Sequence, residues 1–531
     1  MKDIISMRDF SRKEILYVLD FARDIKNAIH DGLDFKKKYG RDITSLLQDI
    51  TVGTLFLENS TRTYFSLRAA VQKAGGSVDG FTSEQDTSLK KGETWASTVS
   101  MFANYGFNAL AMRSTLEGLP RWSADVLQLN YAHMQSAHHL IKIPYAYHKP
   151  LILNGGDGKN QHPTQCFLDL FTIQELAQSH GKELDGLDIA LLNDLAHGRT
   201  NASLMSVAPL FDFKLHLAYP PRFGPRKQHL DDLARHNISV TDYGSDFLEA
   251  MKQSFIAYQS RPQKERVGKG EDLITIKAKG QINKKLYDRL GEHAPYLLHP
   301  LPVDAETFEE ISSDLSYHPK NMTSIQSSNG LYIRIALLTL GLDIIENPLQ
   351  EQSFIEKPYF LETLPLSSRT KFLDNPRSGV IDDCGIVLDH IPAGMGRRLE
   401  GILGLEKEGI PFVSASNLQT TSGTKDLIKI HRPYSFTQGH YEAMALLGPD
   451  ITVNLIEHGI VRNKLRPHLG TLLQGRVQCN NESCVSHVSK EHVTSTHHVE
   501  HMGGQTTLRC HYCESVDSVS HIYEQNRFIY L

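Results

Sequence analysis

Four cysteines lie close together near the end of this 531-residue chain, and their spacing is typical of a metal site. The first pair encloses four residues and the second pair encloses two, with 25 residues between the pairs. Four thiolates complete the tetrahedral shell of a structural zinc ion and leave no position open for a substrate. The ordinary alternative is two pairs of free thiols. Because clustered cysteines in an intracellular chain favour metal over disulfide, we predict a structural Zn²⁺ held by Cys479, Cys484, Cys510 and Cys513.

A run of hydroxyl and guanidinium groups, Ser60-Thr61-Arg62-Thr63, follows the apolar stretch 51–58. Ser60 is a favourable N-cap residue for the helical pattern that follows. The free N–H groups and the dipole of a helix N-terminus attract anions, and the threonine hydroxyls and Arg62 add donors there. The run therefore predicts a phosphate cradle without a glycine-rich loop. An ordinary capped helix with an exposed arginine is the alternative.

A second polar string, His162-Pro163-Thr164-Gln165, follows the apolar stretch 151–154. Proline is favourable at the first position of a helix, which places His162 and Gln165 on one helix face. A histidine there can donate a hydrogen bond to a carbonyl oxygen. A lone histidine is more often structural, so the spacing alone does not decide its role.

Five basic residues, Lys90, Lys91, Arg113, Arg199 and Arg261, lie at the ends of predicted strands or in adjoining loops. The ordinary alternative for each residue taken alone is a solvated charge on the protein surface. Ligands of open α/β sheets bind beyond the carboxyl ends of the strands, so their shared placement predicts a site for a substrate with several negative charges.

Short apolar runs alternate with helical stretches between about residues 50 and 340. One helical stretch, 60–76, ends at glycine. This alternation favours doubly wound α/β architecture with parallel sheets, and the length fits two such domains. The predicted strands are 51–58, 109–112, 151–154, 188–193, 213–219, 254–258 and 296–299.

Composition bounds the class of protein. A net charge of −5, a hydrophobic share of 40% and a charged share of 22% are ordinary for a globular protein and suggest no nucleic-acid or membrane binder. The first residues, MKDIISMRDFSRKE, lack the apolar core of a signal peptide. No stretch approaches the roughly 20 apolar residues of a spanning helix. We therefore expect a cytoplasmic protein.

The motifs together resemble the carbamoyltransferase family over residues 1 to about 345. The motifs on which this resemblance rests are Ser60-Thr61-Arg62-Thr63, His162-Pro163-Thr164-Gln165 and His299-Pro300-Leu301-Pro302. The string 87–94, the string 263–266 after Arg261, and leucine in the last motif are similar to the aspartate branch of that family.

The resemblance implies transfer of a carbamoyl group from carbamoyl phosphate to the amine of L-aspartate, in pyrimidine biosynthesis. It implies that Thr63, Arg113 and His162 form an oxyanion hole, which stabilises the negative charge that develops on the carbamoyl oxygen. Two arginines that clamp two carboxylates would also fit aspartate. The implied substrate-binding residues are Ser60, Thr61, Arg62, Thr63, Ser88, Lys91, Arg113, His162, Gln165, Arg199, Thr200, Arg261, Gln263, Leu301 and Pro302.

Two other functions remain open from the residues. A carbamoyltransferase for another amine, such as ornithine, would need an acid to receive the cationic side chain, where this chain offers arginines. A catalytically inert, nucleotide-sensing scaffold would have no reason to retain every proposed site residue.

The segment from 379 to the end resembles the regulatory chain of aspartate carbamoyltransferase, and the cysteine cluster forms its last part. The matching strings are 388–393, 425–430, 452–454 and 464–467. The resemblance implies binding of a nucleotide effector, whose phosphates suit Lys464 and His390. The implied effector-binding residues are Asp389, His390, Lys429, Asn454 and Lys464.

The predicted architecture is two doubly wound parallel-sheet domains with the carbamoyltransferase fold, an α+β nucleotide-binding domain and a small zinc-binding β domain. The loop that carries Ser88 and Lys91 implies, by resemblance, a homo-oligomer built on a catalytic trimer, because it reaches a neighbouring subunit's site. The expected domains are 1–163 (carbamoyl phosphate, completed by a helix at about 327–345), 164–326 (aspartate), 346–378 (linker), 379–475 (nucleotide) and 476–531 (zinc).

Overall fold

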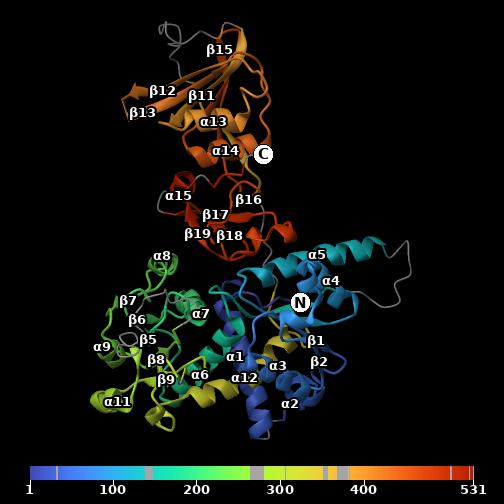
Figure 1. The fold of residues 1–531 in the computed structure, drawn as a ribbon, viewed down its shortest axis with the longest axis vertical. Helices are drawn as coiled ribbons and strands as arrows, with labels where there is room; N and C mark the ends of the chain where they lie inside the picture. The colour runs from blue at the N-terminus through green and yellow to red at the C-terminus, as the bar shows by residue number, and fades with distance from the viewer. Residues whose placement is uncertain are drawn as a thin grey trace. The chain divides into compact units, whose positions relative to one another are not determined.

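The computed structural model describes most of the chain and divides it into two compact units (Figure 1). The first unit is Met1–Gln352 with Ser483–Glu491, and the second is Ser353–Glu482 with His492–Leu531. The described residues are 1–31, 34–137, 148–262, 280–304, 306–350, 357–366, 381, 383–421, 423–502, 505–525 and 527–529.

The first unit begins with a four-stranded parallel sheet in the order β2-β1-β3-β4. Its inner strands come from the predicted apolar runs, which are buried on both faces as parallel sheets require. The strands are β1 (Thr51–Phe56), β2 (Ser77–Phe81), β3 (Ala109–Ser114) and β4 (Leu151–Asp157), joined through α3 (Thr61–Lys73), α4 (Trp95–Asn104) and α5 (Leu119–Ala137).

A second parallel sheet, of five strands, has the order β7-β6-β5-β8-β9. Helices separate most of its strands along the chain, so both sheets are doubly wound α/β as predicted. The strands are β5 (Asp188–Leu192), β6 (Lys214–Ala218), β7 (Val240–Asp242), β8 (Ile256–Gln259) and β9 (Tyr296–Leu298), with helices α7 (Arg199–Val207), α8 (Lys227–Arg235), α9 (Phe247–Lys252) and α11 (Lys284–Leu290).

Long helices of the first unit pack on one another in a shared apolar core. Helix α12 (Thr323–Gly341) packs against α1 (Arg12–His30), α3 and α6 (Pro163–Ser179). Its last turns are buried all round, which explains their run of apolar residues. A short helix, α2 (Phe35–Tyr39), follows α1. Among the described residues, no helix is both long enough and apolar enough to cross a membrane.

The second unit contains a six-stranded antiparallel sheet, ordered β10-β15-β14-β11-β13-β12. Alternate residues of its central strands pack under two helices, α13 (Gly396–Leu403) and α14 (Gln438–Leu447). The strands are β10 (Phe360–Thr363), β11 (Cys384–Pro392), β12 (Phe412–Thr420), β13 (Gly423–Ile430), β14 (Thr452–Glu457) and β15 (Ile460–His468).

Strand β10 lies within the stretch 346–378, which we expected to be a linker. It pairs with β15 from Phe360↔His468 to Thr363↔Leu465. The ring of Phe360 stacks on His468, with ring centroids 4.5 Å apart. The four-residue strand is too short and too mixed in polarity to stand out in the sequence.

The last part of the chain is a small antiparallel sheet, β16-β17-β18-β19, with one short helix. Few apolar side chains fill its core, chiefly Leu473, Val477, Leu508 and Ile522. A β domain with so small a core usually needs a metal or disulfides to be stable. Its elements are β16 (Leu472–Gln474), β17 (Thr496–Met502), β18 (Gln505–Cys510), β19 (Val516–Ser518) and α15 (Val519–Glu524).

Candidate active site and metal centre

A cavity of about 340 Å³ lies in the first unit, beyond the carboxyl ends of strands from both parallel sheets. Segments that are far apart in the sequence meet there because parallel strands end at the same edge of a sheet. The predicted substrate-binding residues that line it are Ser60, Thr61, Arg62, Thr63, Arg113, His162, Gln165, Arg199, Thr200, Arg261, Leu301 and Pro302.

Two of the predicted substrate contacts do not line this cavity, and a third lies outside the described residues. Ser88 and Lys91 belong to a 3₁₀ turn, η4 (Ser88–Lys91), and do not line the cavity of their own chain. Gln263 lies outside the described residues.

The N-terminus of α3 faces the cavity with its backbone N–H groups unused by a side-chain cap. Ser60 occupies the predicted N-cap position with extended backbone, but its hydroxyl makes no cap hydrogen bond. It instead donates to Thr63 Oγ1 over 2.9 Å. The first-turn N–H groups therefore remain available to an anion.

Two arginines, Arg113 in β3 and Arg199 at the start of α7, meet on one carboxylate, Glu58. Arg113 Nη2 lies 2.8 Å from Glu58 Oε1, and both terminal nitrogens of Arg199 lie 3.1 Å from the Glu58 carboxylate. Burial raises the pKa of Glu58, but the charges of Arg199 and Arg113 outweigh it and leave the pKa below its usual value. Glu58 is therefore ionised and orients both guanidinium groups.

Among the described residues, the charged side chains that line the cavity are five arginines and a single glutamate. The excess of positive charge suits a polyanionic ligand. Arg113 is also held by Gly155 O at 3.1 Å, and its buried Nε has no hydrogen-bond partner among the described residues. An unused buried donor in a polar cavity points to a ligand acceptor. The arginines are Arg62, Arg113, Arg199, Arg261 and Arg334.

Sequence reasoning missed Glu58 and Arg334. Glu58 ends the apolar run 51–58 directly before the polar motif, which was its only signal. Arg334 is the one charged residue in the apolar second half of α12, and it is buried, with Nη1 3.0 Å from Gly330 O. An isolated arginine in an apolar helix is a sequence signal for a buried functional or paired charge.

His162 lies at the N-terminus of α6 and is buried. Burial, together with the charges of Arg199 and Arg113, holds its pKa well below the usual value, so the imidazole is neutral. Its backbone N–H donates to Ser203 Oγ over 3.0 Å, and Nδ1 lies 3.4 Å from Thr164 Oγ1. When Thr164 donates to Nδ1, the ring carries its hydrogen on Nε2 and can donate to a carbonyl oxygen.

A buried carboxylate, Asp169, connects three elements behind the site. It accepts hydrogen bonds from Gln165 (2.9 Å), Gln326 (2.6 Å) and the Tyr258 hydroxyl (2.8 Å). Gln326 in turn accepts from the backbone N–H of His299 over 2.8 Å. The network thus ties the 162–165 and 299–302 motifs together.

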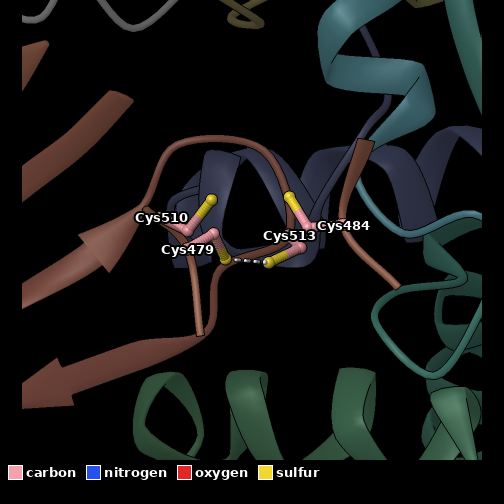
Figure 2. A group of neighbouring side chains, drawn as sticks. All are labelled: Cys479, Cys484, Cys510 and Cys513. Carbon is pink, nitrogen blue, oxygen red and sulfur yellow. Dashed lines mark hydrogen bonds between the residues drawn. The ribbon is translucent and has the colours of Figure 1, made fainter. Parts of the chain in front are cut away.

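The four predicted metal ligands form one buried cluster (Figure 2). Their sulfur atoms all lie within 4.8 Å of one another, and the Sγ atoms of Cys479 and Cys513 are 3.6 Å apart. A tetrahedral ion with Zn–S bonds of about 2.3 Å needs sulfurs about 3.8 Å apart. Donors also surround the thiolates: Asn481 N–H lies 3.4 Å from Cys479 Sγ, and Ser486 Oγ 3.2 Å from Cys484 Sγ. Cys479, Cys484, Cys510 and Cys513 therefore fit a closed, structural zinc site.

The predicted effector residues gather on one face of the antiparallel sheet. Lys429, Val387, Asn454 and Lys464 are directly opposite one another on four neighbouring strands. Opposed residues of antiparallel strands point to the same face, and this face is opposite to the one under α13 and α14.

Asp389, two residues after Val387, lies on the same face and binds Lys425 Nζ at 2.5 Å. His390 has a positive φ of 59° at an irregularity of β11, with Nδ1 3.4 Å from Thr452 Oγ1. The effector face therefore presents lysines, an amide and an acid side by side.

The strand ends of two parallel-sheet domains bring the motifs 60–63, 162–165 and 299–302 together around one cationic cavity. This arrangement defines the carbamoyltransferase class of enzymes. Models of the carbamoyl-P binding and Asp/Orn binding domains of aspartate/ornithine carbamoyltransferases match residues 2–175 and 185–340. Models of the allosteric and metal binding domains of the aspartate carbamoyltransferase regulatory chain match residues 381–468 and 472–522.

Individual relatives agree with the family models. The chain is 32% identical to the aspartate carbamoyltransferase catalytic subunit of Thermococcus gammatolerans over 344 residues, which cover 65% of this chain and 98% of that protein. It is 27% identical to protein PyrBI of Treponema denticola over 98% of this chain and 97% of the relative.

Solved structures give the same result for the first unit's fold. Aspartate transcarbamoylase from Trypanosoma cruzi, in complex with N-(phosphonacetyl)-L-aspartic acid, superposes with a TM-score of 0.51 at 27% identity, covering 64% of this chain and 94% of that one. The M. jannaschii catalytic subunit gives a TM-score of 0.52 at 28% identity, covering 64% and 97%. The chain belongs to the aspartate carbamoyltransferase family, with its catalytic and regulatory chains in one polypeptide.

Proposed function

We propose that the cavity transfers the carbamoyl group of carbamoyl phosphate to the amine of L-aspartate, giving N-carbamoyl-L-aspartate and phosphate. The observation that carries this proposal is the excess of arginines around the neutral His162 in a cavity that the open N-terminus of α3 also lines. Such a site can hold a phosphate, a carbonyl oxygen and two carboxylates at once.

The phosphate of carbamoyl phosphate binds the open N-terminus of α3, with Ser60, Thr61, Arg62, Thr63 and Arg113 as side-chain donors. Thr63, Arg113 and His162 donate to the carbamoyl oxygen. Leu301 and Pro302 have no polar side chain, so their backbone carbonyls are the groups that can accept from the carbamoyl N–H.

The amine of aspartate attacks the carbamoyl carbon with its lone pair. The C–N bond forms and the carbonyl oxygen gains negative charge. The bond between the carbamoyl carbon and the bridging phosphate oxygen then breaks, and its electron pair goes to the phosphate. The attacking nitrogen gives up a proton, which the leaving phosphate takes up as hydrogen phosphate. The enzyme contributes positioning and stabilisation of the developing oxyanion, without a covalent nucleophile.

Arg199 and Arg261 bind the two carboxylates of aspartate, assisted by Thr200 and Gln263, while Gln165 helps to orient the carbamoyl group. The alternative acceptor, ornithine, carries a second ammonium group. The one carboxylate among the described residues that line the cavity, Glu58, is already bound by Arg113 and Arg199, so the charge of the site favours aspartate.

The test is a colorimetric assay of carbamoylated product with aspartate and ornithine supplied in parallel. We expect product from aspartate alone. Product from ornithine, or none from either amine, would contradict the proposal, and the second result would favour the inert scaffold.

We further propose that Ser88 and Lys91 bind carbamoyl phosphate in the site of a neighbouring copy, within a catalytic trimer. Their absence from the cavity of their own chain supports this. Mixing Lys91→Ala with Arg62→Ala protein should restore part of the activity, because some sites then receive neither substitution. Two inactive variants that stay inactive after subunit exchange would contradict a shared site.

The effector face is proposed to bind a nucleotide, with Lys464 and His390 at its phosphates, Lys429 and Asn454 at the base or ribose, and Asp389 beside them. Their alignment on one sheet face supports this. Calorimetric titration with ATP, CTP and UTP should show binding that Lys464→Ala weakens at least tenfold, about 1.4 kcal/mol. Equal binding by wild type and variant would remove Lys464 from the site.

A further inference from the structure

The segment 483–491, which contains the predicted zinc ligand Cys484, packs within the first unit. Its last residue, Glu491, is 6% exposed. The Glu491 carboxylate accepts hydrogen bonds from the backbone N–H groups of Trp95 (2.7 Å) and Ala96 (3.1 Å). Trp95 and Ala96 are the first two residues of α4.

These contacts complete the N-terminus of α4. The first N–H groups of a helix have no partner inside the helix, and a carboxylate is the favoured partner. Thr94 Oγ1 accepts from Ser97 N over 3.1 Å, so the local sequence caps the third N–H group itself. Glu491, almost 400 residues along the chain, supplies acceptors for the first two.

The capped end continues directly into the loop that carries Ser88 and Lys91. Glu93 N donates to Ser88 O over 3.3 Å, and Ser97 Oγ donates to the Glu93 side chain over 3.0 Å. Lys490 Nζ lies 3.2 Å from Glu93 O. Residues 88–97 are therefore one hydrogen-bonded stretch, fixed from outside by Lys490 and Glu491.

The other end of the segment is anchored independently. Glu117 N donates to Ser483 O and Val485 N donates to Glu117 O, each over 2.9 Å. The segment consequently has a fixed place on the first unit at both ends.

We propose that Glu491 is a positioning residue for carbamoyl transfer: its carboxylate fixes the start of α4 and thereby the placement of Ser88 and Lys91. This rests on the proposed function, because it requires the 88–91 turn to contact substrate. Through Glu491, the segment 483–491 would help to set the position of the two side chains that bind carbamoyl phosphate.

The structural part is tested by hydrogen exchange and mass spectrometry on the full chain. In Glu491→Ala we expect the amides of Trp95 and Ala96 to exchange about tenfold faster. Glu491→Gln, which keeps one acceptor oxygen, should fall between. Glu482→Gln is the matched control, because it removes the same charge from an exposed side chain nine residues earlier in the chain and should exchange as wild type. Unchanged exchange in Glu491→Ala would overturn the proposal.

The functional part is tested by kinetics with Lys91→Ala, Glu491→Ala and the double variant. Both single variants should raise KM for carbamoyl phosphate about tenfold, with little change in KM for aspartate. The Glu491 effect should vanish in the Lys91→Ala background. A large Lys91 effect with no Glu491 effect would overturn this inference alone. No effect of Lys91→Ala would overturn the substrate contact, and the inference with it. Additive effects would show that Glu491 acts elsewhere.

Discussion

Arg62 lines the cavity, and its guanidinium makes no hydrogen bond or ion pair with another described residue. Truncation therefore leaves no buried partner exposed. We expect Arg62→Ala to lower kcat by about 10²–10³-fold with the same Tm as wild type. Steady-state kinetics measure the change in kcat, and a thermal melt measures Tm. A variant with wild-type kinetics would show that Arg62 does not belong to the phosphate site.

Arg261 follows β8 of the second parallel sheet, on the acceptor side of the proposed reaction. Arg261→Ala should raise KM for aspartate by at least tenfold, since a charge-assisted hydrogen bond contributes about 1.5–3 kcal/mol. KM for carbamoyl phosphate should change little. Initial rates at varied concentrations of each substrate make the comparison. Equal increases in both KM values would place Arg261 at the phosphate instead.

The residues that the sequence revealed and those that it hid differ in a physical way. Arg62, Arg113 and His162 lie in the segments that follow apolar runs, and strand ends collect ligands in this architecture. Arg334 reaches the cavity from α12, a helix remote in sequence, and Glu491 reaches α4 through the fold. Such long-range partners leave no local pattern.

At the scale of elements, Asp169 is the point where α6, α12 and β8 meet. Burial raises its pKa to about 7, although Gln326, Tyr258 and Gln165 donate to the carboxylate and oppose the shift. The folded state therefore holds a proton on Asp169 between about pH 4 and pH 7, where the unfolded chain has released it. The contribution of Asp169 to stability is greatest below about pH 4 and is lost as the pH rises to about 7.

Asp169→Asn keeps the shape of the side chain and removes this proton uptake. We expect the Tm of the variant to fall less than that of wild type as the pH is raised from about 5 to about 7, with parallel behaviour above about pH 8. Thermal melts across this range measure the difference. Curves that run parallel throughout would show that Asp169 is ionised in the folded state over the whole range.

Element types were predictable where strands are buried on both faces. β1, β3 and β5 are central strands of parallel sheets and are largely apolar and buried, and β4, at the edge of its sheet, is buried as well. The edge strands β2 and β7 were missed, because their residues are largely exposed and polar. Pairing with an inner neighbour, which no local pattern records, makes them strands.

At the scale of the whole molecule, the family's catalytic and regulatory modules share one chain. Fusion fixes their ratio at one to one and keeps each segment 483–491 at a high effective concentration near its target. In separate chains the same contacts would depend on protein concentration.

The zinc ion is expected to support this arrangement rather than the chemistry. Its four thiolates leave no coordination position for substrate, and the core of the β16–β19 sheet is small. Metal binding should therefore supply much of the folding free energy of this region. Removing the metal with a strong chelator, or replacing Cys510 and Cys513 by Ser, should unfold the region and abolish the response to nucleotide.

Carbamoyl transfer should persist after metal removal, with KM for carbamoyl phosphate raised to about the value found for Glu491→Ala. The reason is that loss of Cys484 as a ligand should loosen the segment that caps α4, whereas none of the described residues that line the cavity belongs to the zinc region. Circular dichroism, particle mass and kinetics should be followed together during metal removal, with re-addition of Zn²⁺ as the control. Complete loss of transfer while the particle mass is unchanged would show that the region supports the reaction itself.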